Sequence, residues 1–209
     1  MIKSAFYLAA LAVPLAASPS SLTAQACAGN HASHGSGFAS AFASFTEGAT
    51  GYGVSGGGVT NGPLFVAGSY KRIDADNSDL ATNSLGVTVG AELTGLDFSL
   101  CPAFAFTYSW FANVPFGVDL DEIDLAGGFL IGKSFGEDLL FTPHASAAVV
   151  HARVSASLGS ESETTSDTGG VFAGGFRLGS DRFYGGPGLS ITTFEGSDPV
   201  FSLSAGVVF

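Results

Sequence analysis

Residues 98–110 read FSLCPAFAFTYSW, and large side chains alternate with small ones along the whole stretch. The even positions carry Phe98, Leu100, Pro102, Phe104, Phe106, Tyr108 and Trp110. The odd positions carry Ser99, Cys101, Ala103, Ala105, Thr107 and Ser109. Because side chains along a β-strand point alternately to opposite faces, this stretch predicts a strand with one apolar face and one face too small to form a core.

Nine further segments carry the same alternation to different degrees. The ten predicted strands are 36–46, 51–59, 64–74, 84–94, 97–111, 122–135, 139–157, 168–178, 182–194 and 199–209. Short connections such as TNGP (60–63) and GSD (179–181) alternate with longer ones, DADNSDLATN (74–83), SWFANVPFGVDLDE (109–122) and GSESETTSDT (159–168). This order predicts an all-β protein, a transmembrane antiparallel up-and-down β-barrel. The first two segments alternate weakly, so eight strands with 36–59 as a plug or arm is the alternative to the ten that we expect.

The composition excludes several classes of protein. The chain has 18 acidic and 7 basic residues, a net charge of -11, and only 12% charged residues. Such an acidic chain is an improbable binder of nucleic acid. The mean hydropathy is +0.39, yet no apolar run beyond residue 26 reaches the length of about 18 that a spanning helix needs. A membrane β-barrel reconciles the two observations, because its apolar residues alternate with small or polar ones.

The N-terminus has the pattern of a secretory signal peptide. Lys3 precedes an apolar stretch at 5–17, and Ala24-Gln25-Ala26 matches a signal-peptidase cleavage site. We therefore expect a cleaved signal peptide at 1–26, a periplasmic or lumenal segment at 27–35 and the barrel domain at 36–209. A lipid anchor on Cys27 is disfavoured, because Ala24 and Gln25 fit a lipoprotein signal poorly.

These features together resemble the small outer-membrane barrels of diderm bacteria, the group that contains the barrel domain of outer membrane protein A, outer membrane protein X and the opacity proteins. In that family, a C-terminal Phe preceded by alternating apolar residues is read by the barrel-assembly machinery. The matching positions here are Phe201, Leu203, Ala205, Val207 and Phe209. The resemblance implies a monomer in the bacterial outer membrane, surrounded by lipid and lipopolysaccharide.

Acidic residues concentrate at one end of the predicted barrel. Thirteen of the 18 fall at the ends of strands that would face outside: Glu47, Asp74, Asp76, Asp79, Asp119, Asp121, Glu122, Asp124, Glu161, Glu163, Asp167, Glu195 and Asp198. We expect an acidic extracellular rim with diffuse cation binding. No dedicated metal site or cofactor is expected, because His31 and His34 lie in a Gly- and Ser-rich linker without a third ligand.

Inside the barrel, three charged residues fall on inward positions near the periplasmic end: Glu92, Asp97 and Arg177. They predict lumenal charges that could pair and narrow the passage. Cys27 and Cys101 are the only cysteines, and export places both in an oxidising compartment. The nine residues between Cys27 and the first strand reach about 30 Å, so a disulfide would hold the N-terminal segment across the lumen. Two free or separately reacting thiols are the alternative.

The resulting functional hypothesis is a non-enzymatic barrel with a structural or surface-interaction role and a narrow or plugged lumen. A slender, porin-like channel for ions or small solutes is the main alternative. A lipid A-modifying hydrolase is a third, because His144 and Ser146 would share one strand face, as in the His-x-Ser of the outer-membrane lipid A deacylase. That pair lies near the periplasmic end, however, and Ala147 stands where the deacylase has Asn. We therefore expect no catalytic residues.

Overall fold

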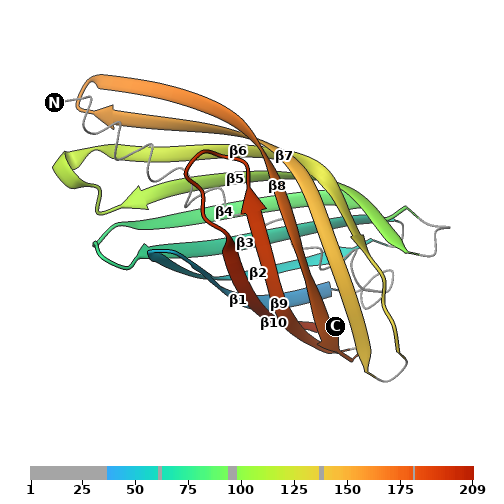
Figure 1. The fold of residues 1–209 in the computed structure, drawn as a ribbon. Coiled ribbons are helices and arrows are strands. Elements are labelled where there is room, and N and C mark those ends of the chain that lie inside the picture. Colours follow the sequence, from blue (N-terminus) through green and yellow to red (C-terminus); the bar gives the residue numbers. More distant parts are fainter. Residues whose placement is uncertain (1–36, 61–62, 94–97, 137–138, 181) are drawn as a thin grey trace.

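The computed structural model describes residues 37–60, 63–93, 98–136, 139–180 and 182–209, and these form a closed antiparallel barrel of ten strands (Figure 1). The strands are β1 (Gly37–Thr46), β2 (Ala49–Val59), β3 (Leu64–Ala75), β4 (Ala81–Ala91), β5 (Ser99–Ala112), β6 (Asp119–Gly132), β7 (Leu140–Leu158), β8 (Glu161–Gly179), β9 (Phe183–Thr192) and β10 (Val200–Val208). A 3-10 turn, η1 (Pro115–Gly117), lies between β5 and β6. In the described ranges, no helix has the length and apolar character needed to span a membrane.

The first two strands belong to the wall, so the eight-stranded alternative is wrong. β1 pairs with β2 on one side and with β10 on the other, in registers that include Ser44 opposite both Gly51 and Ser202. The alternation is weak in β1 and β2 because small Ala, Ser and Gly residues occupy many positions on both faces.

The outer surface of the wall is apolar. Along β5 the even-numbered side chains point outward, and Phe104 keeps 69% of its surface exposed. On other strands, the residues that point outward are exposed in the same way: Val66, Val87, Leu125, Val149, Phe172 and Leu189. A soluble protein does not expose a continuous apolar surface of this size. This surface is therefore the lipid-facing belt of a transmembrane barrel.

Aromatic rings and glycines pair across neighbouring strands on the lumenal face. The directly opposed pairs are Phe38 with Gly57, Phe42 with Gly53, Phe65 with Gly90, and Tyr184 with Gly206. In each pair the ring occupies space that a Cβ on the glycine would need. The glycines thus let bulky rings lie flat against the wall, which fills the lumen without widening the barrel.

Apolar side chains fill the periplasmic half of the lumen. One buried cluster joins Phe38, Phe65, Ala67, Cys101, Ala103, Ala105, Leu130 and Ala148, which come from five strands. Closer to the other end, Phe194 from the β9–β10 connection packs against Val150, Ala152 and Val171. Rings and small apolar groups, rather than an open passage, therefore line much of the described interior.

The lengths of the connections do not sort as the sequence predicted. The β1–β2 and β7–β8 connections contain two residues each, whereas the β4–β5 and β6–β7 connections at the opposite end contain seven. The predicted loop at 159–168 is instead strand, because Glu161 to Thr168 pair in register with Leu158 to His151. Since extracellular extensions are the longer ones in such barrels, the end with the β7–β8 turn is the outer end, and the end where β1 begins and β10 ends is periplasmic.

Candidate functional site

The outer half of the β7–β8 hairpin extends well beyond the ends of β9 and β10 at the outer end (Figure 1). Each of its strands has 19 residues, whereas about 9 to 11 residues suffice to cross a membrane. All residues of β8 from Glu161 to Thr168 are exposed. The outer half of this hairpin is therefore a two-sided structure in water, which explains why it lacks the apolar alternation of the membrane-spanning strands.

One edge of this projecting strand has no partner. β8 pairs with β7 along its whole length, but its pairing with β9 begins only at Val171, opposite Thr192. The last contact on the β9 side joins Gly170 to Thr193, with Thr193 N–H donating to Gly170 O at 2.9 Å and Gly170 N–H donating to Thr193 Oγ1 at 2.7 Å. From Glu161 to Gly169, no strand of the described chain covers this edge.

The backbone geometry identifies which groups face the open edge. In an antiparallel ladder, successive residues direct their N–H and C=O groups to alternate sides. Because Gly170 directs both groups toward β9, Ser162, Thr164, Ser166 and Thr168 direct theirs to the same side. We call the backbone of residues 161–169 on that side the open edge.

Charge on the hairpin is also unequally distributed between its faces. Glu161, Glu163 and Asp167 lie on the face of inward parity, and Ser162, Thr164, Ser166 and Thr168 lie on the other. His151 and Arg153 of β7 share the Ser and Thr face, where His151 Nδ1 lies 2.9 Å from Thr168 Oγ1. The open edge is therefore bordered by an acidic face and a neutral polar face.

Most of the acidic residues predicted for the outer rim lie there, but two do not. Glu47, Asp76, Asp79, Asp119, Glu161, Glu163, Asp167, Glu195 and Asp198 are exposed at the outer end, and Asp74 and Asp121 are half-buried there. Glu122 and Asp124 instead point into the lumen from β6 and are buried. Their even numbers give them the inward parity of β6, which placement at a strand end had obscured.

A row of polar side chains crosses the lumenal face from β3 to β6. In register, Lys71 lies opposite Ser84, Ser84 opposite Ser109, and Ser109 opposite Glu122. The Ser84 and Ser109 hydroxyl oxygens are hydrogen-bonded at 2.9 Å. Glu122 is 0% exposed, and neither of its carboxylate oxygens has a hydrogen-bond partner. Lys71 Nζ is also buried without a hydrogen-bond partner. Sequence reasoning missed Lys71, although its inward parity in the predicted strand 64–74 could have indicated it.

Of the predicted lumenal charges, Glu92 and Arg177 are described and have different neighbours. Glu92 accepts a hydrogen bond from Ser99 Oγ at 2.8 Å. The guanidinium carbon of Arg177 lies 5.1 Å from the centre of the Tyr184 ring, and Asp97 lies outside the described residues. Within the described residues, an ion pair joins Arg72 Nε to Asp74 Oδ1 at 2.9 Å, on the outward face of β3. An ion pair that narrows the passage stays a prediction.

The remaining predicted residues have defined places. Cys101 is fully buried on the lumenal face of β5, whereas Cys27, His31 and His34 lie outside the described residues, so the disulfide stays a prediction. His144 and Ser146 share the lumenal face of β7, but the contact of His144 Nδ1 is with Thr142 O at 3.4 Å. That contact does not provide the nucleophile and base pair that hydrolysis by Ser146 needs.

The proposed assembly residues all lie on one face of the last strand. Phe201, Leu203, Ala205, Val207 and Phe209 are exposed on the lipid-facing side, and Phe209 retains 76% of its surface. Phe209 also completes the seam of the barrel, because its N–H donates to Gly37 O at 2.9 Å and its carbonyl accepts from Gly37 N–H at 2.7 Å. The alternation is confirmed, and the role of these residues in assembly stays a prediction.

No family model matches the chain, and no curated protein matches it in sequence. Among solved structures, the translocator domain of the autotransporter NalP from Neisseria meningitidis is similar with a TM-score of 0.53 and 13% identity, over 96% of this chain and 99% of that one. The N-terminal β-barrel domain of Pseudomonas aeruginosa OprF gives 0.43 and 15%, over 84% and 98%. Ail of Yersinia pestis gives 0.47 and 15%, over 84% and 99%. The closed wall and the lipid-facing belt identify the chain as a transmembrane β-barrel of the outer-membrane type, and the likeness to the NalP domain supports this fold.

Proposed function

We propose that this protein is a surface-interaction barrel that binds an extended, positively charged segment of another protein along the open edge of β8. The observation that carries the proposal is the edge of β8 from Glu161 to Gly169 that has no partner strand, on an exposed, projecting hairpin. On this edge the Thr168 N–H is bonded locally, to Asp167 Oδ1 at 2.7 Å. Such an edge is a template for an additional strand, and most proteins cover or shorten their edges to avoid this. Strand addition at a sheet edge is an established mode of peptide recognition.

The charge of the partner follows from the face that it would extend. A strand added at the open edge would place alternate side chains beside Glu161, Glu163 and Asp167. Lysine or arginine at those positions would be attracted, and acidic residues would be repelled. The other face of the added strand would meet Ser162, Thr164 and Ser166, which favour small polar residues.

The lumen supports an interaction role rather than transport. The apolar cluster around Phe38, Phe65 and Leu130 occupies the periplasmic half of the lumen, and Phe194 packs into the outer half. A barrel of this strand number has little interior space beyond what side chains fill. The slender channel is therefore the less favoured function.

A peptide-binding experiment on the refolded barrel in detergent micelles tests the proposal. The probe is a fluorescent seven-residue peptide that alternates Lys and Thr, and its control alternates Glu and Thr. Ser166→Pro removes an N–H from the open edge without removing a hydrogen bond to β7, whereas Ser166→Ala keeps the N–H. We expect the Lys peptide to bind, and binding to weaken about fivefold to tenfold in Ser166→Pro relative to Ser166→Ala, since one hydrogen bond contributes about 1 kcal/mol.

A second variant makes the test independent of local distortion by proline. The double variant Glu161→Gln and Glu163→Gln keeps the backbone and removes two charges, so it should weaken binding of the Lys peptide and reduce its dependence on salt. Equal binding of the Lys and Glu peptides, or equal affinity of all variants, would rule out recognition at the open edge.

A further inference from the structure

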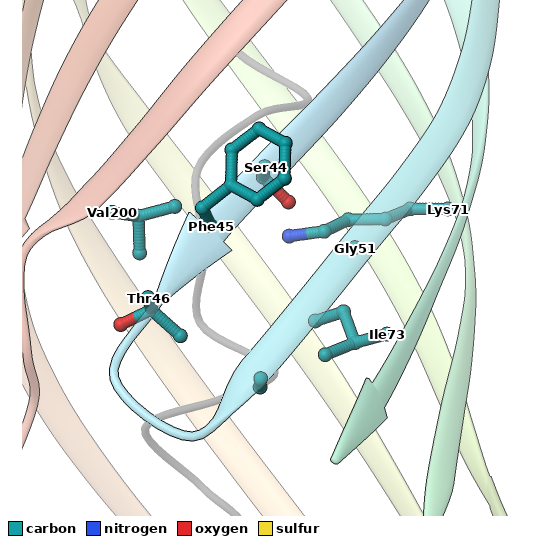
Figure 2. Close-up of a pocket in the computed structure, with 8 residues that line it drawn as sticks. Ser44, Phe45, Thr46, Gly51, Lys71, Ile73 and Val200 are labelled. Atoms are coloured by element: carbon teal, nitrogen blue, oxygen red, sulfur yellow. The ribbon is translucent and has the colours of Figure 1, made fainter. Parts of the chain in front are cut away.

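A hollow at the outer end of the barrel contains an unpaired lysine. Its enclosed part is about 10 Å³, room for about one water-sized group, and the rest is open to solvent. It lies where β1, β2, β3 and β10 meet. Its walls include Ser44, Thr46, Ile73, Val200 and Lys71 (Figure 2). The hollow is separate from the sites described above, because neither the open edge of β8 nor the assembly residues of β10 include Lys71 or Ser44.

The Lys71 ammonium has been brought into this hollow without a counter-charge. Figure 2 shows the side chain running from β3 across Gly51 toward the end of β1. Lys71 is 6% exposed, and Nζ is buried with no hydrogen-bond partner. Withdrawing an ammonium from water is unfavourable unless an opposite charge and hydrogen bonds compensate it.

No carboxylate of the described chain supplies that charge. Glu122 and Asp124, the two buried carboxylates among the described lumenal residues, both stand on β6, three strands away from Lys71 around the wall. Asp74 pairs with Arg72 on the outward face, and Glu47, Asp76 and Asp198 are exposed. The compensating group would therefore come from outside the described chain.

Ser44 and Gly51 shape the hollow beside the ammonium. A Cβ on Gly51 would lie 2.5 Å from Ser44 Oγ and 3.3 Å from Lys71 Cε. The hydroxyl and the lysine stem thus approach the same point from two sides, and glycine alone leaves that point open. Thr46 Oγ1 already donates to Pro199 O at 3.2 Å, so Ser44 is the hydroxyl available to a ligand.

We propose that this hollow binds the carboxylate group of a small organic acid. The two donors, Lys71 Nζ and Ser44 Oγ, match the two oxygens of a carboxylate, and a charged donor strengthens such a contact. Ile73 and Val200 also line the hollow, so a short hydrocarbon body lying in the part open to solvent would have apolar contacts. The site is separate from the open edge, so it can fail or succeed independently of the proposed function.

Calorimetric titration of the refolded barrel with propionate in a chloride-free buffer tests the site. We expect saturable binding that weakens at least tenfold both in Lys71→Met, which removes the charge, and in Gly51→Ala, which fills the space. Lys133→Met removes a cation near the opposite end, and Gly68→Ala adds a methyl where the nearest atom is 3.9 Å away; both should leave binding unchanged.

The remaining outcomes also decide the proposal. Absence of saturable binding to the wild-type barrel, or equal binding by Lys71→Met, would overturn it. Competition by chloride as strong as that by acetate would show a general anion site and overturn the assignment to carboxylates. Selective competition by acetate would support it. Circular dichroism of each variant verifies that the barrel has folded.

Discussion

The Phe42 ring on β1 lies directly opposite Gly53 on β2 and occupies the space where a Cβ on Gly53 would stand, its Cζ atom 2.5 Å from that position. The Tyr70 carbonyl oxygen of β3 approaches the same position from the other side. Gly53 is therefore enclosed by a ring and by a backbone, and only the ring can move.

The first prediction is that Gly53→Ala destabilises the barrel by about 1 to 3 kcal/mol, the usual cost of overpacking. Gly68→Ala is the matched control, because its Cβ would meet nothing closer than 3.9 Å. Urea unfolding in micelles, followed by the shift between folded and heat-denatured mobility on gels, measures both. Equal midpoints for the two variants would show that the ring over Gly53 is not a tight contact.

The second prediction concerns the buried carboxylate of Glu122. Neither of its oxygens has a hydrogen-bond partner, so Glu122→Gln, which removes the charge and keeps the shape, should stabilise the barrel by about 1 to 3 kcal/mol. The exposed Glu163→Gln should change stability by less than about 0.5 kcal/mol. A loss of stability in Glu122→Gln would mean that a cation or the neighbouring Asp124 carboxyl compensates the Glu122 carboxylate in the folded barrel.

The third prediction separates assembly from stability at Phe209. Phe209→Ala removes an exposed ring and keeps both backbone hydrogen bonds to Gly37. The variant should therefore be depleted in the outer membrane of expressing cells, yet unfold in vitro within about 1 kcal/mol of the wild type. Phe104→Ala, which removes another lipid-facing ring, should reach the membrane in normal amounts. Normal surface levels of Phe209→Ala would remove the basis for the assembly role.

The fourth prediction is the disulfide between Cys27 and Cys101. Cys101 is fully buried among apolar lumenal side chains near the periplasmic end, on the side where the barrel chain begins. Peptide mapping of non-reduced protein from the outer membrane should find the two cysteine peptides joined. Alkylation of both thiols in freshly exported protein would contradict the pairing.

Much of the fold follows from the alternation of residues, because lipid on one side and a crowded lumen on the other impose opposite demands on neighbouring positions. The strand around Phe104 satisfies both demands and was predictable from its sequence alone. The outer half of β8, ESETTSDT, has water on both faces, so no hydrophobic alternation distinguishes it from a loop. Its run of Thr and Ser between acidic residues was the available signal, since Thr favours strands.

The positions of charged residues were harder to predict than the strands. The place of Glu122 and Asp124 near a strand end predicts that they belong to the rim, but parity and the pairing of β6 with β5 place them inside. Lys71 follows the same parity as Phe65 and Ala67. What parity could not reveal is that no carboxylate of the described chain reaches it, because that depends on the register of four neighbouring strands.

Amide hydrogen exchange along residues 161–169, measured by NMR on the barrel in micelles, tests the central claim most directly. The open edge predicts fast exchange for Ser162, Thr164 and Ser166, whose N–H groups face water, and slow exchange for the odd-numbered residues bonded to β7. Thr168 is protected separately, because its N–H donates to Asp167 Oδ1 at 2.7 Å. Addition of the Lys and Thr peptide should slow the even-numbered amides selectively. Uniform protection of all nine amides before any peptide is added would show that the edge is covered, and uniform fast exchange would show that the projecting hairpin does not form.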